Sequence, residues 1–435
     1  MTRYFAFLLL LAGPVACTEV TSAPGDCPTF CPNGTIESKD TIFTDIIVRD
    51  SSYRGYIQGY QAEAMTAADI PGVIDSRAFF VTNKISTDTT SPLDSTTRVP
   101  YFADSVRLSL IMVRRDTLAT NLRVKLYALP VTADSTSTFF SLQPYFAGPV
   151  VDSFSVGAIL SQPAIHDTVG QRLYGDSVFW TDSAGHVITA RDSGRTLNLI
   201  WHLDSLQAPL VAADSGRLAY GIRVAADSFA TVAFSTLEAG GQPALIWYFH
   251  YTQPDTATST PDTVVARVAS RAAQFDSFVF DRAVQPLDSN LTVGGVPSAR
   301  SLLRVDLPAY IRDSIDVVRA TLILVPVAPV LGSPADSFEL RALPVLADVG
   351  AKSPVTGVLT FKTIIHLNSA DTVRMELTDL VRNWALDTTQ TRSVMLGQVP
   401  EAASYPEIHF YSSRAPAFRP ALHITYVKRY PFGTP

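Results

Sequence analysis

Cysteine is the residue type with the clearest chemical possibilities in this 435-residue chain, which contains only three. Two of them, Cys27 and Cys31, lie in the segment CPTFCPNG. In an exported chain, which meets an oxidising compartment, such a pair favours a small loop disulfide. A metal site is the alternative, but the C-x-x-x-C spacing has no second Cys or His pair nearby. We therefore expect a disulfide, with no metal and no cofactor.

The rest of the sequence does not demand any particular catalytic chemistry. It contains no G-x-S-x-G, no H-E-x-x-H and no Gly-rich phosphate loop. The seven histidines are dispersed, mostly in strand-like segments, and turns between apolar runs explain the many aspartates. We therefore expect that the protein is not an enzyme. A net charge of −6 with scattered basic residues also argues against a nucleic-acid partner.

The third cysteine, Cys17, ends a segment that is typical of export. Arg3 precedes an apolar stretch at 4–12, which is too short to span a membrane, and small residues follow. This segment resembles a bacterial lipoprotein signal, although Pro14 stands where that signal usually has Leu. The resemblance implies cleavage before Cys17, lipid attachment to it and, because Thr18 follows, an outer-membrane or cell-surface location. Ordinary signal-peptidase cleavage, which would give a secreted or periplasmic protein, is the alternative.

The chain divides by composition into five parts. The signal peptide covers 1–16, and a Pro-, Gly-, Ser- and Thr-rich tether covers 17–39. Two long segments, 40–252 and 264–430, have alternating apolar patterns and many turn residues. Between them, 253–263 is rich in Pro, Thr and Asp and is predicted to be a linker.

The two long segments are similar to each other. VRLSLIMV at 106–113 matches VRATLILV at 318–325, and VKLYALPV at 124–131 matches FELRALPV at 338–345. Further matches follow in the same order, which indicates two homologous domains. These pair ATVAFST with PEIHFYS (230–236, 406–412), Pro-Ala-Leu with Pro-Ala-Leu (243–245, 420–422) and Arg77 with Arg300.

Alternation of apolar and polar residues predicts the fold class. RSLLRVDLP at 300–308 and the stretch at 317–325 both have the pattern of strands with one buried face. Many such strands joined by many turns predict an all-β protein with two tandem antiparallel β-sandwich domains of jelly-roll-like form. Trp201 and Trp247 are expected in the cores or on a sheet face. Trp384 is expected in a core, on a short helix that Thr378 or Asp379 could cap, with a ligand platform as the alternative.

Only the first domain carries an insertion, at about 132–195. It contains a hairpin-like segment at 177–190 with Trp180, and Tyr174 precedes that segment. These two aromatic residues are the candidates for stacking on a sugar, since aromatic faces bind the apolar side of a carbohydrate. The alternative is that the insertion only covers a sheet edge.

The second domain resembles a known family through four motifs: RSLLRVDLP, VVRATLILV, LTDLVRNW and FYSSRAPAFRPALHITY. These are similar to the DNRLRE-type domains of bacterial exported proteins, which are β-sandwiches related to carbohydrate-binding modules. The resemblance covers residues 270–426 and reaches the first domain only through the duplication. It implies an exported β-sandwich protein that is held to a membrane by its lipid anchor and binds polysaccharide or other envelope material. The alternative is a structural or adhesive envelope protein that binds other proteins.

Overall fold

Strand β15 (Ala244–Gln253) shows how the sequence pattern becomes structure in this computed structural model. Leu245, Trp247, Phe249 and Tyr251 are buried, and the residues between them are partly exposed. This alternation is that of a strand with one face in a core. The structure describes residues 38–84, 88–91, 94–100, 102–116, 118–160, 177–181, 187–192, 196–203, 217–253, 262–282, 286–332 and 337–429.

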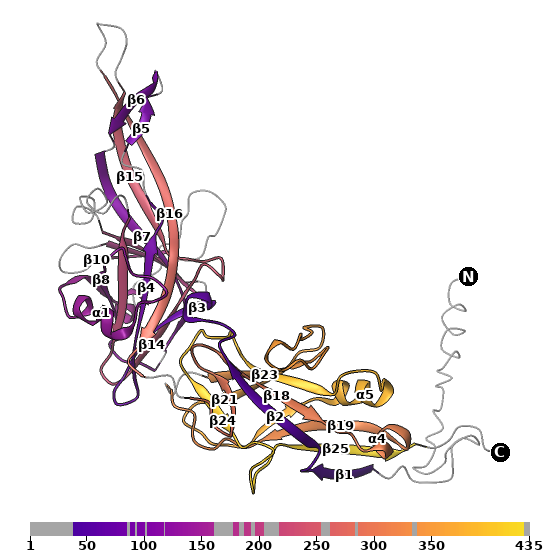
Figure 1. Cartoon of the computed structure of the whole chain (residues 1–435). Coiled ribbons are helices and arrows are strands. Elements are labelled where there is room, and N and C mark those ends of the chain that lie inside the picture. Colours follow the sequence, from indigo (N-terminus) through magenta and orange to yellow (C-terminus); the bar gives the residue numbers. More distant parts are fainter. Residues whose placement is uncertain are drawn as a thin grey trace, which may run out of the picture.

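Most elements are strands in antiparallel sheets, which confirms the predicted all-β fold (Figure 1). The strands of the first half are β1 (Ser38–Phe43), β2 (Ile47–Arg54), β3 (Ala64–Ile70), β4 (Ile74–Thr82), β5 (Asp88–Ser91), β6 (Asp94–Pro100), β7 (Phe102–Arg115), β8 (Arg123–Ala128), β9 (Val150–Ser155), β10 (Ser177–Thr181), β11 (Val187–Asp192), β12 (Leu197–His202), β13 (Ala219–Ala225) and β14 (Ala230–Ser235). After β15 come β16 (Thr263–Phe280), β17 (Leu291–Gly294), β18 (Ala299–Val305), β19 (Ile315–Leu324), β20 (Ser337–Pro344), β21 (Phe361–His366), β22 (Val373–Glu376), β23 (Ser393–Val399), β24 (Glu407–Phe410) and β25 (Ala421–Lys428). The helices are short: η1 (Gly59–Gln61), α1 (Phe139–Phe146), α2 (Val156–Leu160), α4 (Ala309–Asp313), η2 (Gly350–Lys352) and α5 (Thr378–Leu386).

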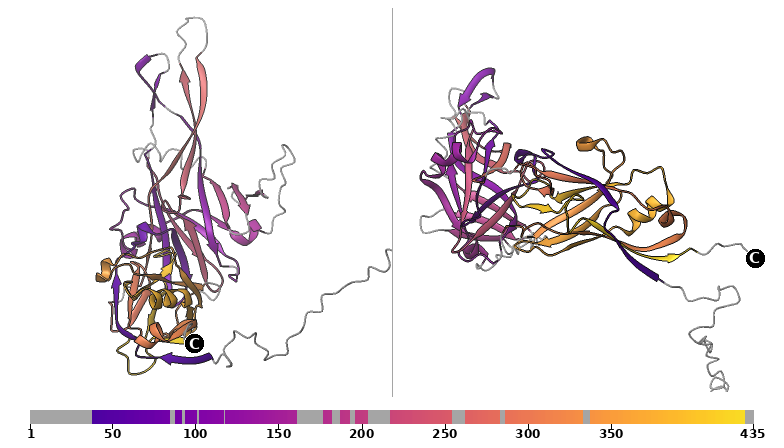
Figure 2. Two further views of the ribbon diagram at one scale, coloured as in Figure 1. Left: turned by 90° about the vertical axis from the view of Figure 1, so that its right-hand side faces the viewer. Right: turned by 60° about the horizontal axis from the view of Figure 1, so that its bottom comes forward.

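Apart from β5 and β6, which form a separate two-stranded sheet, the strands form two units, which meet at an angle (Figures 1 and 2). The first unit is the twelve-stranded sheet, with the order β10-β11-β12-β7-β14-β3-β4-β13-β8-β9, in which β15 joins β7 to β16 and β16 also pairs with β4. The second unit has a seven-stranded sheet, β21-β20-β23-β18-β17-β24 with β2 on β18, and a four-stranded sheet, β1-β25-β19-β22. We call them the N-unit and the C-unit.

Both units bury apolar side chains between two layers of strands, which is sandwich packing. In the C-unit, Leu322 and Ile424 of the four-stranded sheet share a core with Leu340 and Phe410 of the seven-stranded sheet. In the N-unit, Trp201 and Trp247 share a core with side chains of β4, β8 and β13. The long strands β7 and β16 belong to both layers there, which is why the N-unit counts as one sheet.

Segments that match in sequence occupy the same places in the two units. The order β4-β13-β8-β9 in the N-unit corresponds to β18-β23-β20-β21 in the C-unit. Likewise, β12-β7-β15 corresponds to β22-β19-β25. The first strands of each repeat are exchanged, however. The N-terminal strands β1 and β2 pair with β25 and β18 of the C-unit, whereas β16, from the start of the second repeat, pairs with β15 and β4 of the N-unit.

Figure 1 makes this exchange visible by colour, because indigo β2 lies against orange β18 and salmon β16 lies among violet strands. The predicted boundaries at 40–252 and 264–430 therefore do not coincide with the boundaries of the sheets. The predicted linker at 253–263 does not separate two folding units, since Gln253 at the end of β15 pairs with Thr263 at the start of β16. The alternating patterns identified the strands correctly, but such a pattern does not specify a strand's partner.

The three tryptophans predicted to be core residues are buried. Trp201 and Trp247 belong to the N-unit core, and Trp384 lies on α5 in the C-unit core. Helix α5 begins after Leu377, and the hydroxyl of Thr378 accepts from the backbone N–H of Ala320 instead of capping the helix. Leu380, Val381 and Trp384 therefore close the end of the sandwich beside β19.

Candidate functional site

Most of the residues singled out from sequence lie outside the described part of the chain. This holds for Cys17, Cys27, Cys31 and Tyr174, so the lipid attachment and the disulfide stay predictions. The backbone of Trp180 is described in β10, which pairs with β11 as the hairpin pattern predicts. Strand β11 in turn pairs with β12, with Ile188 opposite Trp201, so this hairpin extends one edge of the N-unit sheet.

The described residues bring other aromatic side chains together, on the outer face of β7, β15 and β16. Because Trp247 and Phe249 face the core, Tyr248 and His250 point to the opposite side of β15. His250 lies opposite Phe102 of β7 in the strand register. We call the surface formed by Phe102, Asp104, Arg107, Tyr248 and His250 the arm face, because these strands extend away from the C-unit (Figure 1).

Contacts between neighbouring strands hold the side chains of the arm face in place. The rings of Phe102 and His250 are stacked, with centroids 5.3 Å apart and planes 20° apart. Asp104 Oδ1 lies 2.7 Å from His250 Nδ1. The Arg107 guanidinium lies over the Tyr248 ring, 4.4 Å from its centre, which is a cation–π contact. It also donates to the Tyr248 hydroxyl at 3.3 Å.

The arm face is open to solvent and partly apolar. Phe102 is 51% exposed, and the His250 side chain is 35% exposed. On β16, Val268 stands opposite Tyr248, and both Val264 and Val268 are exposed. A sheet surface with exposed rings next to an Arg and an Asp offers stacking and hydrogen bonds at the same time.

The sequence analysis missed this surface, although a signal for it was present. ALIWYFHY was interpreted as a strand with its tryptophan in the core, and period-two alternation then places Tyr248 and His250 on the outer side. What the pattern did not reveal is that Phe102 of a distant strand stacks on His250, and that this pair of rings stays partly exposed.

One buried carboxyl group has a strongly shifted pKa. Burial raises the pKa of Asp276 to about 7; the backbone N–H of Leu237, which donates to it at 3.0 Å, opposes the shift, and the nearby charge of Glu238 adds to it. A shifted acid is one mark of an active site. Here, however, Asp50 of β2 occupies the equivalent register in the C-unit and accepts from the backbone N–H of Ser413 in the equivalent loop. The repetition indicates a structural role that the two units share.

Neither similarity to known proteins nor a metal-binding cluster points to an activity for this chain. The sequence matches no known family and no curated protein. Within the described ranges, no group of three or more His, Cys, Asp or Glu side chains is placed to hold a metal ion. No helix in that part of the chain is long and apolar enough to cross a membrane.

Proposed function

We propose that this chain is a non-catalytic exported protein, anchored through lipid on Cys17, that binds envelope carbohydrate on the arm face. The observation that carries the proposal is the row of partly exposed rings, Phe102, His250 and Tyr248, fixed by Asp104 and Arg107. A pyranose ring can stack its C–H face on such rings, while its hydroxyls bond to the carboxylate and the guanidinium. We therefore propose the outer sheet surface as the carbohydrate site, with Trp180 on the β10–β11 hairpin as the competing location.

The equivalent surface of the C-unit supports this choice by contrast. The alignment of the two Pro-Ala-Leu segments puts Thr425 where the N-unit has Tyr248, and Val427 where it has His250. There, Asp40 of β1 forms an ion pair with His423 at 3.3 Å, and Arg319 forms one with Glu376 at 2.7 Å. The rings are thus specific to one unit and are not needed to build the fold.

A glycan-array and polysaccharide-pulldown screen of the full chain tests the proposal. Tyr248→Thr introduces the residue that the C-unit already carries, so the fold should tolerate it. We expect binding to weaken by about tenfold or more, the order expected for losing one stacked ring. Tyr145→Thr, at an exposed tyrosine on α1, is the matched control and should bind normally.

Two outcomes would contradict the arm face as the site. If no glycan binds the unmodified chain, the carbohydrate function is wrong. If Trp180→Ala abolishes binding while Tyr248→Thr retains it, the site lies on the β10–β11 hairpin.

The second candidate function is adhesion to another protein. It is favoured by Val264 and Val268, which continue the arm face as an exposed apolar surface on β16. Pairing of a partner strand with the edge of β16 is disfavoured, since Arg267 and Arg271 lie on its inner side, opposite Phe249 and Leu245, and inward-pointing charges protect sheet edges. An adhesive partner would therefore bind the surface of the sheet. Val264→Asp, which lies opposite Thr252 and not opposite Tyr248, would weaken the binding of such a partner while the sugar contact at Tyr248 stays in place.

A further inference from the structure

A cleft of about 240 Å³ lies where the N-unit and the C-unit meet, well separated in the fold from the arm face. Its apolar wall has contributions from both units: Ile74 and Phe280 come from β4 and β16, and Pro329, Leu331 and Tyr405 come from loops of the C-unit. A cavity of this size is smaller than a typical drug-sized pocket and suits a ligand with about one ring.

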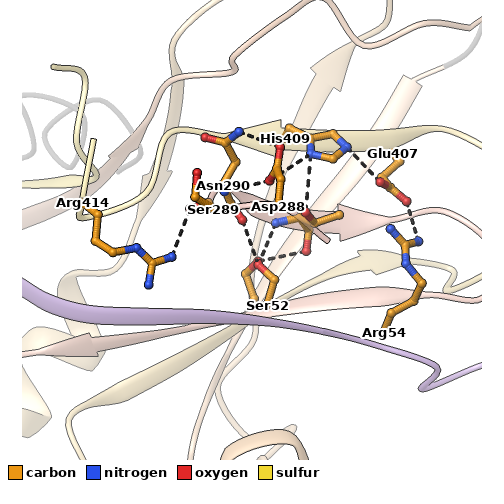
Figure 3. Close-up of polar contacts among 10 residues, drawn as sticks. Ser52, Arg54, Asp288, Ser289, Asn290, Glu407, His409 and Arg414 are labelled. Atoms are coloured by element: carbon orange, nitrogen blue, oxygen red, sulfur yellow. Dashed lines mark hydrogen bonds and ion pairs between the residues drawn. The ribbon is translucent and has the colours of Figure 1, made fainter. Parts of the chain in front are cut away.

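Charged side chains line one side of the cleft. Figure 3 shows the contacts of three of them, Arg54, Glu407 and His409. Glu407 of β24 lies between two cations, with its Oε2 2.6 Å from Arg54 Nη1 and its Oε1 2.8 Å from His409 Nε2. Gly295 makes room for this group: it adopts φ +75°, and a Cβ there would lie 2.4 Å from Glu407 Oε2. The close approach of Arg54 and Glu407 therefore depends on a glycine at this position.

The protonation of this cluster follows from its hydrogen bonds. The bond to Glu407 raises the pKa of His409, against the opposing effect of burial. Burial alone would raise the pKa of Glu407, but the hydrogen bonds from His409 and Arg54 outweigh it and lower that pKa. Asp288 lies 3.9 Å from His409 Nδ1 and also favours the charged imidazolium. Glu407 is thus neutralised by Arg54, and a protonated His409 adds positive charge.

Arg282 is a cation of the cleft that forms no ion pair with a described carboxylate. It lines the cleft just after β16, it is exposed, and it makes no hydrogen bond or ion pair with any residue that the structure describes. Its neighbour Asp281 accepts from the backbone N–H of Asp75 instead. The lining groups therefore sum to a positive charge next to an apolar wall.

We propose that this cleft binds a small organic carboxylate with one ring. The carboxylate pairs with Arg282, because a guanidinium presents two parallel N–H donors that match a carboxylate. The ring of the ligand packs on Phe280 and Pro329, which removes apolar surface from water. A uronic acid and an aromatic acid share this chemistry, and they are distinguished by the choice of probe.

Isothermal titration of the full chain with sodium glucuronate, benzoate and glucose tests the proposal. We expect at least one of the two carboxylates to bind and glucose, which has the ring but not the charge, to fail. Binding of glucuronate alone would identify an acidic sugar, and binding of benzoate alone an aromatic acid. Arg282→Ala should weaken binding by about tenfold or more, because it removes a charge-assisted pair. Arg374→Ala, an exposed arginine on β22 away from the cleft, is the matched control.

The pH dependence gives a second measurement. Binding should tighten as the pH is lowered and His409 gains its proton, and His409→Gln should remove this dependence. The groups that face His409 are Glu407, Asp288 and Arg54, with the Thr292 hydroxyl at 3.5 Å. The proposal is overturned if neither carboxylate binds, or if Arg282→Ala binds as well as the unmodified chain. Glycan binding through Tyr248 is measured separately, so either proposal can fail alone.

Discussion

The N-unit and the C-unit bury an aspartate at the same point of equivalent strands and surround it with opposite charges. Asp50 of β2 stands opposite Leu303 of β18, and Asp276 of β16 stands opposite Phe80 of β4. Each carboxylate accepts from a backbone N–H in the loop after the equivalent strand. In the C-unit the next residue of that loop is Arg414, whose Nη2 lies 3.6 Å from Asp50; in the N-unit it is Glu238.

This difference shows that the hydrogen bond is what the fold requires, whereas the charge is free to vary. A buried carboxyl can accept from a backbone N–H whether it is ionised or neutral. With Arg414 beside it, an ionised Asp50 has a compensating charge. In the N-unit, burial above all, with a further contribution from the charge of Glu238, raises the pKa of Asp276 to about 7, so below that pH the buried group is a neutral acid.

The exchange of first strands gives the largest expected effects. Phe278→Ala should destabilise the N-unit by about 3–5 kcal/mol, because this side chain of the second repeat is buried in the N-unit core. Ile47→Ala should destabilise the C-unit by about 2–5 kcal/mol for the same reason. Hydrogen exchange resolved by residue measures both: Phe278→Ala should expose amides of β4, and Ile47→Ala those of β18.

Each variant serves as the control for the other. If Phe278→Ala increased hydrogen exchange in β18 and left the amides of β4 protected, the first strands would pair within their own repeats. The described swapping of β2 and β16 between the units would then be wrong. Leu303 lies on β18, a C-unit strand that pairs within its own unit. Leu303→Ala should therefore give the same pattern of amide hydrogen exchange as Ile47→Ala.

The sequence predicted the strands well and their pairing poorly. RSLLRVDLP predicted β18, and the alternation in ALIWYFHY predicted β15 with Trp247 in the core. The exchange of β2 and β16 could not be predicted, because both segments carry similar patterns and each fits either repeat. The cleft was also unpredictable, since Arg282 and Glu407 are distant in sequence and meet only where the units join.

The pH dependence of stability should reveal the raised pKa of Asp276. The pKa of Asp276 rises from 3.8 to about 7 on folding, so the unfolded chain loses this proton first as the pH increases. Stability is therefore highest below about pH 4 for this group, falls as the pH approaches 7 and is constant above it. Asp276→Asn should remove that loss and, at about pH 8, stabilise the N-unit by up to about 4 kcal/mol. Denaturant unfolding at a series of pH values measures it.

The matched variant is Asp50→Asn, for which we expect the opposite sign. It replaces the carboxyl group next to Arg414 by an amide and should destabilise the C-unit at about pH 8 by about 1 kcal/mol, because Arg414 is exposed and solvent weakens the pair. If both variants changed stability in the same direction at this pH, the contrast between the two sites would be wrong.

The smallest and most specific effect should come from exchanging the loop charge itself. Glu238→Arg gives the N-unit loop the charge that the C-unit carries at Arg414, so ionised Asp276 gains an opposite charge in place of a like one. The pKa of Asp276 should then fall below about 7, and the N-unit should gain about 1 kcal/mol at about pH 8, because position 238 is exposed and solvent weakens the interaction. Glu238→Gln should give about half of the gain, since it only removes the repulsion. NMR titration of the Asp276 carboxyl carbon follows the pKa directly. An unchanged titration in Glu238→Arg would mean that burial alone sets the pKa and that the loop charge has no part in the difference between the units.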